Sequence, residues 1–150
     1  MVRRLLTVVL FCSILLAALT SCAPAGKGGD MSDHAMGMKM AALSDMPAEV
    51  QAAPASVQDA YRFNVANPEL MKQIPCYCGC GSMGHTSNYD CYVKSVDGDK
   101  ITFDQHALGC GICVDITKDA MRLSAEGKTA AEIKAYIDQT YSQYGPSNIP

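Results

Sequence analysis

Three cysteines separated by single residues constrain this chain more than any other feature of its sequence. They are Cys76, Cys78 and Cys80. In an extended segment, alternate residues point to one face and lie roughly 6.5–7 Å apart. A disulfide needs Cα atoms about 4.4–6.8 Å apart with converging Cβ atoms, so neighbours in this run are poor partners for each other. A metal ion can collect all three thiolates, because Gly79 lets the backbone curl.

Three more cysteines and two histidines follow within a short stretch. Cys110 and Cys113 form a C-x-x-C pair at the expected start of a helix, and Cys91 lies between this pair and the run. A helix N-terminus stabilises a thiolate, which serves either metal ligation or thiol–disulfide exchange. His85 and His106 are close to these cysteines in sequence. The candidate metal ligands are therefore Cys76, Cys78, Cys80, Cys91, Cys110, Cys113, His85 and His106.

Three interpretations of the cysteines stay open. We favour a thiolate metal site, because six clustered thiols exceed what a simple redox pair needs. The second interpretation is a set of three long-range disulfides, whose pairing the sequence cannot choose. The third is a redox dithiol at Cys110 and Cys113. No catalytic triad, phosphate-binding loop or paired-carboxylate signature stands out, so we expect a binding protein rather than an enzyme.

The thiolate ligands also bear on the identity of the metal. Soft thiolates select Cu(I), zinc or iron–sulfur clusters. We expect Cu(I) first, because six thiolates exceed the four ligands that zinc takes. An iron–sulfur cluster needs four cysteines but would have to be assembled before export. Covalent c-type haem would need a histidine directly after Cys113, where Val114 stands.

The cysteine run resembles a family of bacterial lipoproteins named for a Pro-Cys-Tyr-Cys-Gly-Cys motif, which spans residues 75–80 here. In that family the motif precedes a Gly-His pair, another cysteine, and a histidine before a C-x-x-C that opens a helix. This chain has the same order, with Gly84-His85, Cys91, His106, Cys110 and Cys113. The resemblance covers roughly residues 56–145. It implies a lipoprotein class but no activity, because the family name records a motif.

The C-terminal third is also similar to the membrane-anchored thiol oxidoreductases of cytochrome c maturation. The likeness rests on the C-x-x-C pair, the segment 126–129, Glu132-Ile133 and Tyr144-Gly145. It implies a small helical fold and a C-x-x-C that reduces apocytochrome thiols. A Leu-Arg before the first cysteine is missing, and that family has no C-x-C-x-C run. Such an enzyme is the best alternative to metal binding.

Residues 1–21 have the pattern of a lipoprotein signal peptide. A positive start and an apolar run through Leu19 precede Thr-Ser-Cys, which ends at Cys22 and resembles a lipobox. The resemblance implies cleavage before Cys22 and lipid attachment to its sulfur, whereas the alternative is an uncleaved transmembrane anchor. We therefore expect an extracytoplasmic protein that is lipid-anchored to the cell membrane or the outer membrane.

Residues 22–43 have no hydrophobic period and predict a flexible tether. His34 and four methionines lie within residues 31–40, either as weak Cu(I) collectors or by chance. Removing residues 1–21, which carry two arginines and no acid, takes the formal net charge from −3 to −5. A mildly acidic protein is not expected to bind nucleic acid, and its expected partners are the membrane and an unidentified metal donor or acceptor protein.

Residues 44–150 predict a mainly α fold: a small helical domain with a cysteine-rich loop and one short β-hairpin. Helical spacing starts at Ser56, an expected cap, and Pro68 suits the first turn of a second helix. A helix is also expected over 113–123, followed by a capping box from Thr129 and an apolar face on the last helix. That face comprises Ile133, Tyr136, Ile137, Tyr141 and Tyr144.

The loops around the cysteines carry three further expectations. Asp-Gly at residues 97–98 between β-forming flanks predicts the hairpin. Tyr77 is expected to pack over the cysteine site. Asp90 and Asp104 are expected to serve as turn and solubility residues.

Overall fold

The computed structural model of the protein describes residues 38–149. Residues 1–37, which include the predicted signal peptide, Cys22 and most of the predicted tether, lie outside this part, so the expectations about them stay predictions. Five α-helices and one antiparallel hairpin make up the regular structure of the described residues, together with short 3₁₀ turns. The predicted fold class, a small helical domain with one short hairpin, is confirmed.

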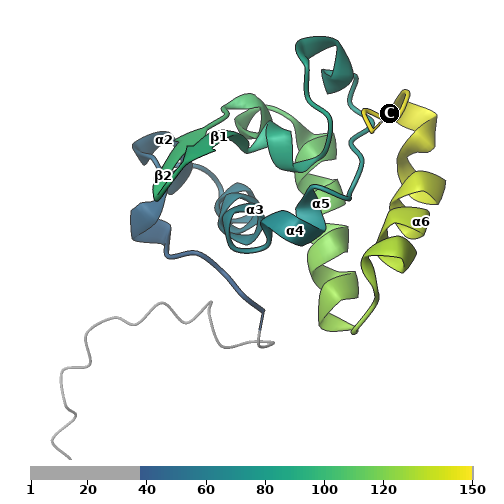
Figure 1. The fold of residues 1–150 in the computed structure, drawn as a ribbon, viewed down its shortest axis with the longest axis horizontal. Coiled ribbons are helices and arrows are strands. Elements are labelled where there is room, and N and C mark those ends of the chain that lie inside the picture. The colour runs from purple at the N-terminus through teal and green to yellow at the C-terminus, as the bar shows by residue number, and fades with distance from the viewer. Residues whose placement is uncertain (1–37, 150) are drawn as a thin grey trace, which may run out of the picture. The chain divides into compact units, whose positions relative to one another are not determined.

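Helix α3 lies at the centre of the fold and contacts both α2 and α5, while α6 packs on α5 (Figure 1). The hairpin lies on the other side of α3 from α6. The cysteine-rich loop connects α4 to β1 along the chain and lies at the top of this view. The regular elements are α2 (Ala48–Gln51), α3 (Ala55–Ala66), α4 (Pro68–Met71), β1 (Val93–Asp97), β2 (Lys100–Phe103), α5 (Gly111–Ala125) and α6 (Ala130–Tyr141).

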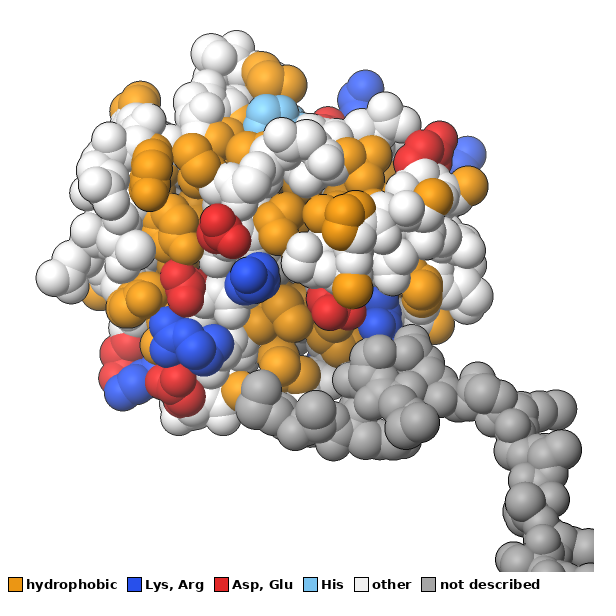
Figure 2. All heavy atoms as spheres, turned by 180° about the vertical axis from the view of Figure 1, so that it is seen from behind, with side chains coloured by type: hydrophobic (Ala, Val, Ile, Leu, Met, Phe, Trp, Pro, Cys, Tyr) orange, Lys and Arg blue, Asp and Glu red, His pale blue; other side chains and the backbone are white. Residues whose placement is uncertain are grey.

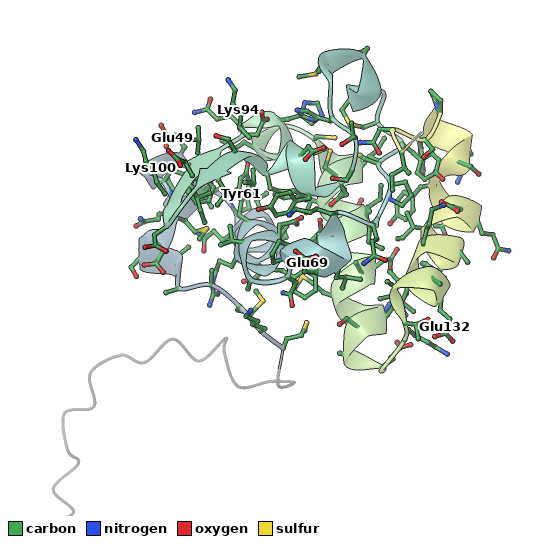
Figure 3. All side chains as sticks on the ribbon, viewed as in Figure 1. Glu49, Tyr61, Glu69, Lys94, Lys100 and Glu132 are labelled. Carbon is green, nitrogen blue, oxygen red and sulfur yellow. The ribbon has the colours of Figure 1, made fainter. Side chains whose placement is uncertain are left out.

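The second half of helix α3 is buried on nearly all sides, from Ala60 to Ala66. Tyr61, labelled in Figure 3, is fully buried, and its hydroxyl donates to the carbonyl oxygen of Asp104 at 2.7 Å. The expected cap at Ser56 is wrong, because Pro54 is the N-cap and no side chain caps this end. Pro68 does occupy the first turn of α4, as predicted. A proline fits there because the first amide groups of a helix have no partner within it.

Local signals in the sequence set the turn between α5 and α6. Gly127 has a φ of +78°, the left-handed conformation expected after a helix. Thr129 accepts from the Glu132 amide, and the Glu132 carboxylate accepts from the Thr129 amide, which confirms the capping box. The apolar face of α6 is narrower than predicted. Tyr136 is 37% exposed, because only one side of the helix meets α5, and Tyr144 is 57% exposed because α6 ends at Tyr141 and Tyr144 lies in the 3₁₀ turn that follows.

The hairpin forms where the Asp-Gly signal predicts it. Asp97 pairs with Lys100, and Gly98 has a φ of +56° in the turn. The register shifts between Val93 and Ser95 in a bulge. Val93 is buried, whereas the rest of β1 is exposed, and β1 contacts the 3₁₀ turn at Tyr89–Cys91 of the cysteine loop.

The folded part begins before Leu43. The Arg62 guanidinium donates from Nε to the carbonyl oxygen of Ala41 at 2.8 Å, and the Asn67 amide donates to Lys39 at 2.8 Å. Met38 and Met40 are partly buried against the core. Residues 38–41 therefore lie along α3, and two of the four methionines in residues 31–40 pack on the domain.

Figure 2 shows one face of the molecule, where acidic and basic side chains are interspersed with apolar ones. No basic patch gathers on this face. Within residues 38–149, no helix combines the length and hydropathy that crossing a membrane requires.

Candidate metal centre

After α4, the chain forms a loop that contains the cysteine run and turns back on itself. Gly79 has a φ of +86°, which is strained for other residues, and a 3₁₀ turn begins at Cys80. A second left-handed glycine, Gly84, ends this turn, and the chain then returns to Cys91. The curled loop therefore places Cys91 beside the run, 3.6 Å from Cys80 between sulfur atoms.

The start of α5 brings the other two cysteines to the same place. The Cys113 sulfur lies 3.6 Å from that of Cys76 and 3.6 Å from that of Cys78. Cys76 and Cys78 are themselves 3.4 Å apart between sulfurs. Cys110 caps α5, accepting from the Cys113 amide. All six cysteines are thus gathered into one cluster formed by the loop and one helix end.

The two histidines occupy different positions at this cluster. His106 Nε2 lies 3.3 Å from the Cys78 sulfur. His85 belongs to neither group of candidate ligands, and its Nε2 lies 3.6 Å from the Asp104 carboxylate with its ring against that of His106. Its Nδ1 is buried and has no hydrogen-bond partner among the described residues. Of the two histidines, only His106 therefore lies within ligand distance of the sulfur atoms.

The ligand atoms fall into two groups of four, each with all atoms within 4.8 Å of one another. The buried group contains Cys76, Cys78, Cys80 and Cys91, and the outer group contains Cys78, His106, Cys110 and Cys113. Zinc–sulfur bonds of about 2.3 Å place tetrahedral ligands about 3.8 Å apart. Most sulfur separations given above are 3.4–3.6 Å, so the cluster is close to the spacing that metal ligation requires.

All six cysteines are free thiols. The shortest separation, 2.8 Å, is between the Cys110 and Cys113 sulfurs. It is longer than the disulfide bond of about 2.05 Å. The structure therefore presents the reduced cluster, with the C-x-x-C pair the closest to bridging.

Hydrogen bonds between the thiols spread their pKa values widely. Hydrogen bonding with the Cys113 thiol lowers the pKa of Cys76 and brings that of Cys110 to about 6. The pKa of Cys113 is raised by the same hydrogen bonds. Burial raises the pKa of Cys78 to about 12, and the hydrogen bond to Cys76 raises that of Cys80. The metal-free cluster thus retains part of its protons, which a metal ion would displace.

A buried polar network holds the loop against the helices. Asn88 is fully buried, donates to the Cys113 carbonyl oxygen at 3.3 Å and accepts from the Thr117 hydroxyl at 2.8 Å. Thr117 also contacts the Tyr92 hydroxyl at 2.9 Å and the Asn64 amide at 3.2 Å. Because buried polar groups need partners, this network fixes the loop relative to α3 and α5.

The C-terminal tail closes the other side of the loop (Figure 1). The Asn148 side chain accepts from the Cys76 amide at 2.7 Å and donates to the Ser87 carbonyl oxygen at 3.0 Å. Its amide nitrogen also lies 3.5 Å from the Cys80 sulfur. At Gly145, a Cβ atom would lie 2.9 Å from the Tyr77 carbonyl oxygen, so only glycine fits this approach.

Residues next to the cluster make contacts of their own. The Tyr77 hydroxyl donates to Asp138 of α6 at 2.6 Å, which ties the cysteine run to that helix. Asp104 is more than a turn residue, because its carboxylate accepts from the His106 amide at 2.8 Å and faces His85. Asp90 does stabilise its loop, accepting from Thr86 at 2.7 Å.

The sequence interpretation missed the supporting residues Asn88, Thr117 and Asn148. The helical spacing offered one signal, because Thr117 lies one turn after Cys113 and shares its face. Asn88 and Asn148 had none, since isolated asparagines in loops are common turn residues. Their role arises from contacts between segments far apart in the chain.

Comparison with known proteins identifies the family. Residues 8–150 match the family described as proteins of unknown function with a PCYCGC motif. The chain belongs to this family. No curated protein and no solved structure matches it. The resemblance to the oxidoreductases of cytochrome c maturation is therefore not supported by these comparisons.

Proposed function

We propose that this protein is a membrane-anchored extracytoplasmic lipoprotein that holds soft metal, with Cu(I) the favoured ion, for handling, storage or delivery. One observation carries the proposal: six free thiols and the His106 imidazole lie within ligand distance in a largely buried cluster. Neither a redox dithiol nor a structural core needs so many converging donors.

The donor chemistry supports copper over the other metals. Thiolate sulfur is a soft ligand that suits Cu(I), whereas one zinc ion takes only four ligands. The two groups share Cys78, so together they comprise seven ligand residues. A single tetrahedral zinc ion would leave three of them without a metal. The seven donors therefore fit more than one ion, and six of them are soft sulfurs of the kind that suits Cu(I).

Metal content and thiol count test the proposal together. Residues 23–150, which contain the six cysteines of the cluster and omit Cys22, are prepared without oxygen, offered Cu(I) or zinc, and measured by native mass spectrometry. We expect retained metal with six free thiols after release by acid, and Cu(I) held against a competing chelator more strongly than zinc. Three disulfides and no retained metal would support the stapled lipoprotein instead.

One observation favours a thiol oxidoreductase as the second candidate. The Cys110 and Cys113 sulfurs are 2.8 Å apart, and hydrogen bonds from Cys113 lower the pKa of Cys110 to about 6. Cys110 in the reduced metal-free protein should therefore react with iodoacetamide at pH 7, and more slowly as the pH falls through 6. This reactivity alone does not distinguish the two functions.

Variants separate the two functions. A metal site requires the buried group, so Cys80→Ser should reduce metal binding, whereas a dithiol enzyme needs only Cys110 and Cys113. Reduction of a disulfide-bonded peptide by the Cys80→Ser protein at the wild-type rate, with unchanged metal content, would establish the enzyme and overturn our proposal.

Localisation is tested at Cys22. The wild-type chain should partition with membranes, and Cys22→Ser should prevent lipid attachment and release or mislocalise the protein. Equal membrane retention of the variant would favour an uncleaved transmembrane anchor. A metal donor or acceptor protein in the same compartment is the partner that this function requires.

A further inference from the structure

The two ligand groups overlap at a single residue. Cys78 is the only described residue that belongs to both, and each group is complete with four ligand atoms. We propose that the site is binuclear: two soft metal ions, one in each group, bridged by the sulfur of Cys78. This inference rests on the proposed metal binding and adds the number of ions and their connection.

The position of Cys78 is that of a bridge. Its sulfur lies 3.4 Å from that of Cys76 in the buried group and 3.6 Å from that of Cys113 in the outer group. The His106 Nε2 atom is 3.3 Å away on the outer side. A thiolate sulfur has more than one lone pair, so it binds two ions in different directions. Two four-coordinate ions sharing one ligand need seven donors, which is the number present.

A single ion leaves the arrangement unexplained. An ion in the outer group alone would leave Cys76, Cys80 and Cys91 without metal, although all three are buried and converge. An ion in the buried group alone would leave His106, Cys110 and Cys113 without metal, although the His106 Nε2 atom lies beside the Cys78 sulfur. Two ions use every donor and neutralise more of the thiolate charge, which is costly to bury.

The two ions differ in their ligands. The buried group offers four sulfurs, whereas the outer group offers three sulfurs and one imidazole nitrogen. The Asp104 carboxylate accepts from the backbone amide of His106 at 2.8 Å, which holds the main chain at this position, and the imidazole packs edge-on against His85. His106 is thus the one donor that distinguishes the ions chemically.

The two ions also differ in exposure. Three ligands of the buried group are buried, whereas Cys78, His106 and Cys110 of the outer group are only partly buried. A chelator in solution reaches the outer group first. The outer ion is therefore the exchangeable one, and the buried ion is retained.

NMR spectroscopy of bound cadmium-113 detects the bridging sulfur directly. The full mature chain is reduced and loaded with ¹¹³Cd(II), a soft ion with a nuclear spin. We expect two resonances, one at the shift of four sulfur ligands and one at that of three sulfurs and a nitrogen. Scalar coupling between the two nuclei would pass through the Cys78 sulfur. Two uncoupled resonances would overturn the bridge, and a single resonance with one bound ion would overturn the binuclear site.

Matched variants assign the resonances. His106→Ala should abolish the sulfur–nitrogen resonance and its coupling, while His85→Gln, a histidine outside both groups, should retain both. Cys80→Ser should perturb the all-sulfur resonance. Cys78→Ser should remove the coupling and lower the stoichiometry from two ions toward one. If Cys78→Ser does not fold, the coupling in the wild-type protein still decides.

Cu(I) provides the second measurement. Native mass spectrometry of the Cu(I)-loaded chain should give two ions in the wild-type protein, and one after treatment with a moderate chelator. Loss of both ions together would overturn the difference in exchange. One ion throughout would leave the proposed function standing and refute the binuclear site. No bound metal under any of these conditions would refute both.

Discussion

The cysteine loop and the α5–α6 pair are held together by different forces. The two helices are joined by a capped turn and packed through apolar side chains such as Ile133 and Ile137, which are fully buried. The loop of residues 72–92 has only 3₁₀ turns, and its place is set by Asn88, Asn148 and the sulfur cluster.

This difference separates stability from function. Apolar packing and helix caps act in the same way whether or not a metal is bound. The loop's polar contacts hold six thiols close together, and a metal ion would add bonds among these same atoms. We therefore expect the helix pair to be stable without metal and the loop to gain most from it. The following predictions test this contrast, from the largest expected effect to the smallest.

Truncating the core of the helix pair should be the most damaging change. Ile137→Ala leaves a cavity between α5 and α6 and should lower the free energy of unfolding by about 2–5 kcal/mol. The loss should be equal in the metal-free and metal-loaded protein, measured by urea denaturation. Gln139→Ala, at an exposed position on the same helix, is the control. A loss confined to one metal state would show that the regions are coupled.

Removing the buried amide of the loop should have an intermediate effect. Asn88→Ala leaves the Thr117 hydroxyl and the Cys113 carbonyl short of a partner, at a cost of about 1–3 kcal/mol. The cost should be greater without metal, since bound metal would hold Cys113 in place. Hydrogen exchange should report the change in residues 72–92. Ser82→Ala, an exposed position in the same loop, should change little.

The capping box should matter less, and equally in both states. Thr129→Ala removes the acceptor of the Glu132 amide and should cost about 1 kcal/mol. Thr129→Ser keeps the hydroxyl and should retain most of the stability. Thermal unfolding followed by circular dichroism with and without metal would measure both. Metal dependence of this small loss would contradict the independence of the helix pair.

The smallest effect is expected at the ion pair on α6. Lys134 Nζ lies 2.7 Å from Asp138, but both side chains are more than a third exposed. Lys134→Ala should therefore change the free energy of unfolding by less than about 1 kcal/mol. This change should become smaller still at high salt concentration, which screens the ion pair. Asp138 retains the Tyr77 hydroxyl as a donor. A large loss of stability would mean that the Lys134–Asp138 ion pair is needed to hold the loop against α6.

The sequence alone determined what is encoded by neighbouring residues. The Asp-Gly turn, Pro68 at a helix start and the Thr129 capping box all depend on contacts within a few residues. The C-x-C-x-C spacing likewise identified the cysteines that cannot bridge one another easily. Helical spacing then gave the fold class, although it overstated the buried face of α6.

Only the tertiary structure determined how the candidate ligands divide into the buried and the outer group. Which sulfurs meet depends on a left-handed turn at Gly79 and on Asn88 and Asn148, whose partners lie far along the chain. The sequence offered His85 and His106 as equivalent, yet the fold places the His106 ring beside Cys78 and the His85 ring beside Asp104. Because such contacts form between segments remote in sequence, neither spacing nor periodicity encodes them, and the shared position of Cys78 emerges only when the loop folds onto α5.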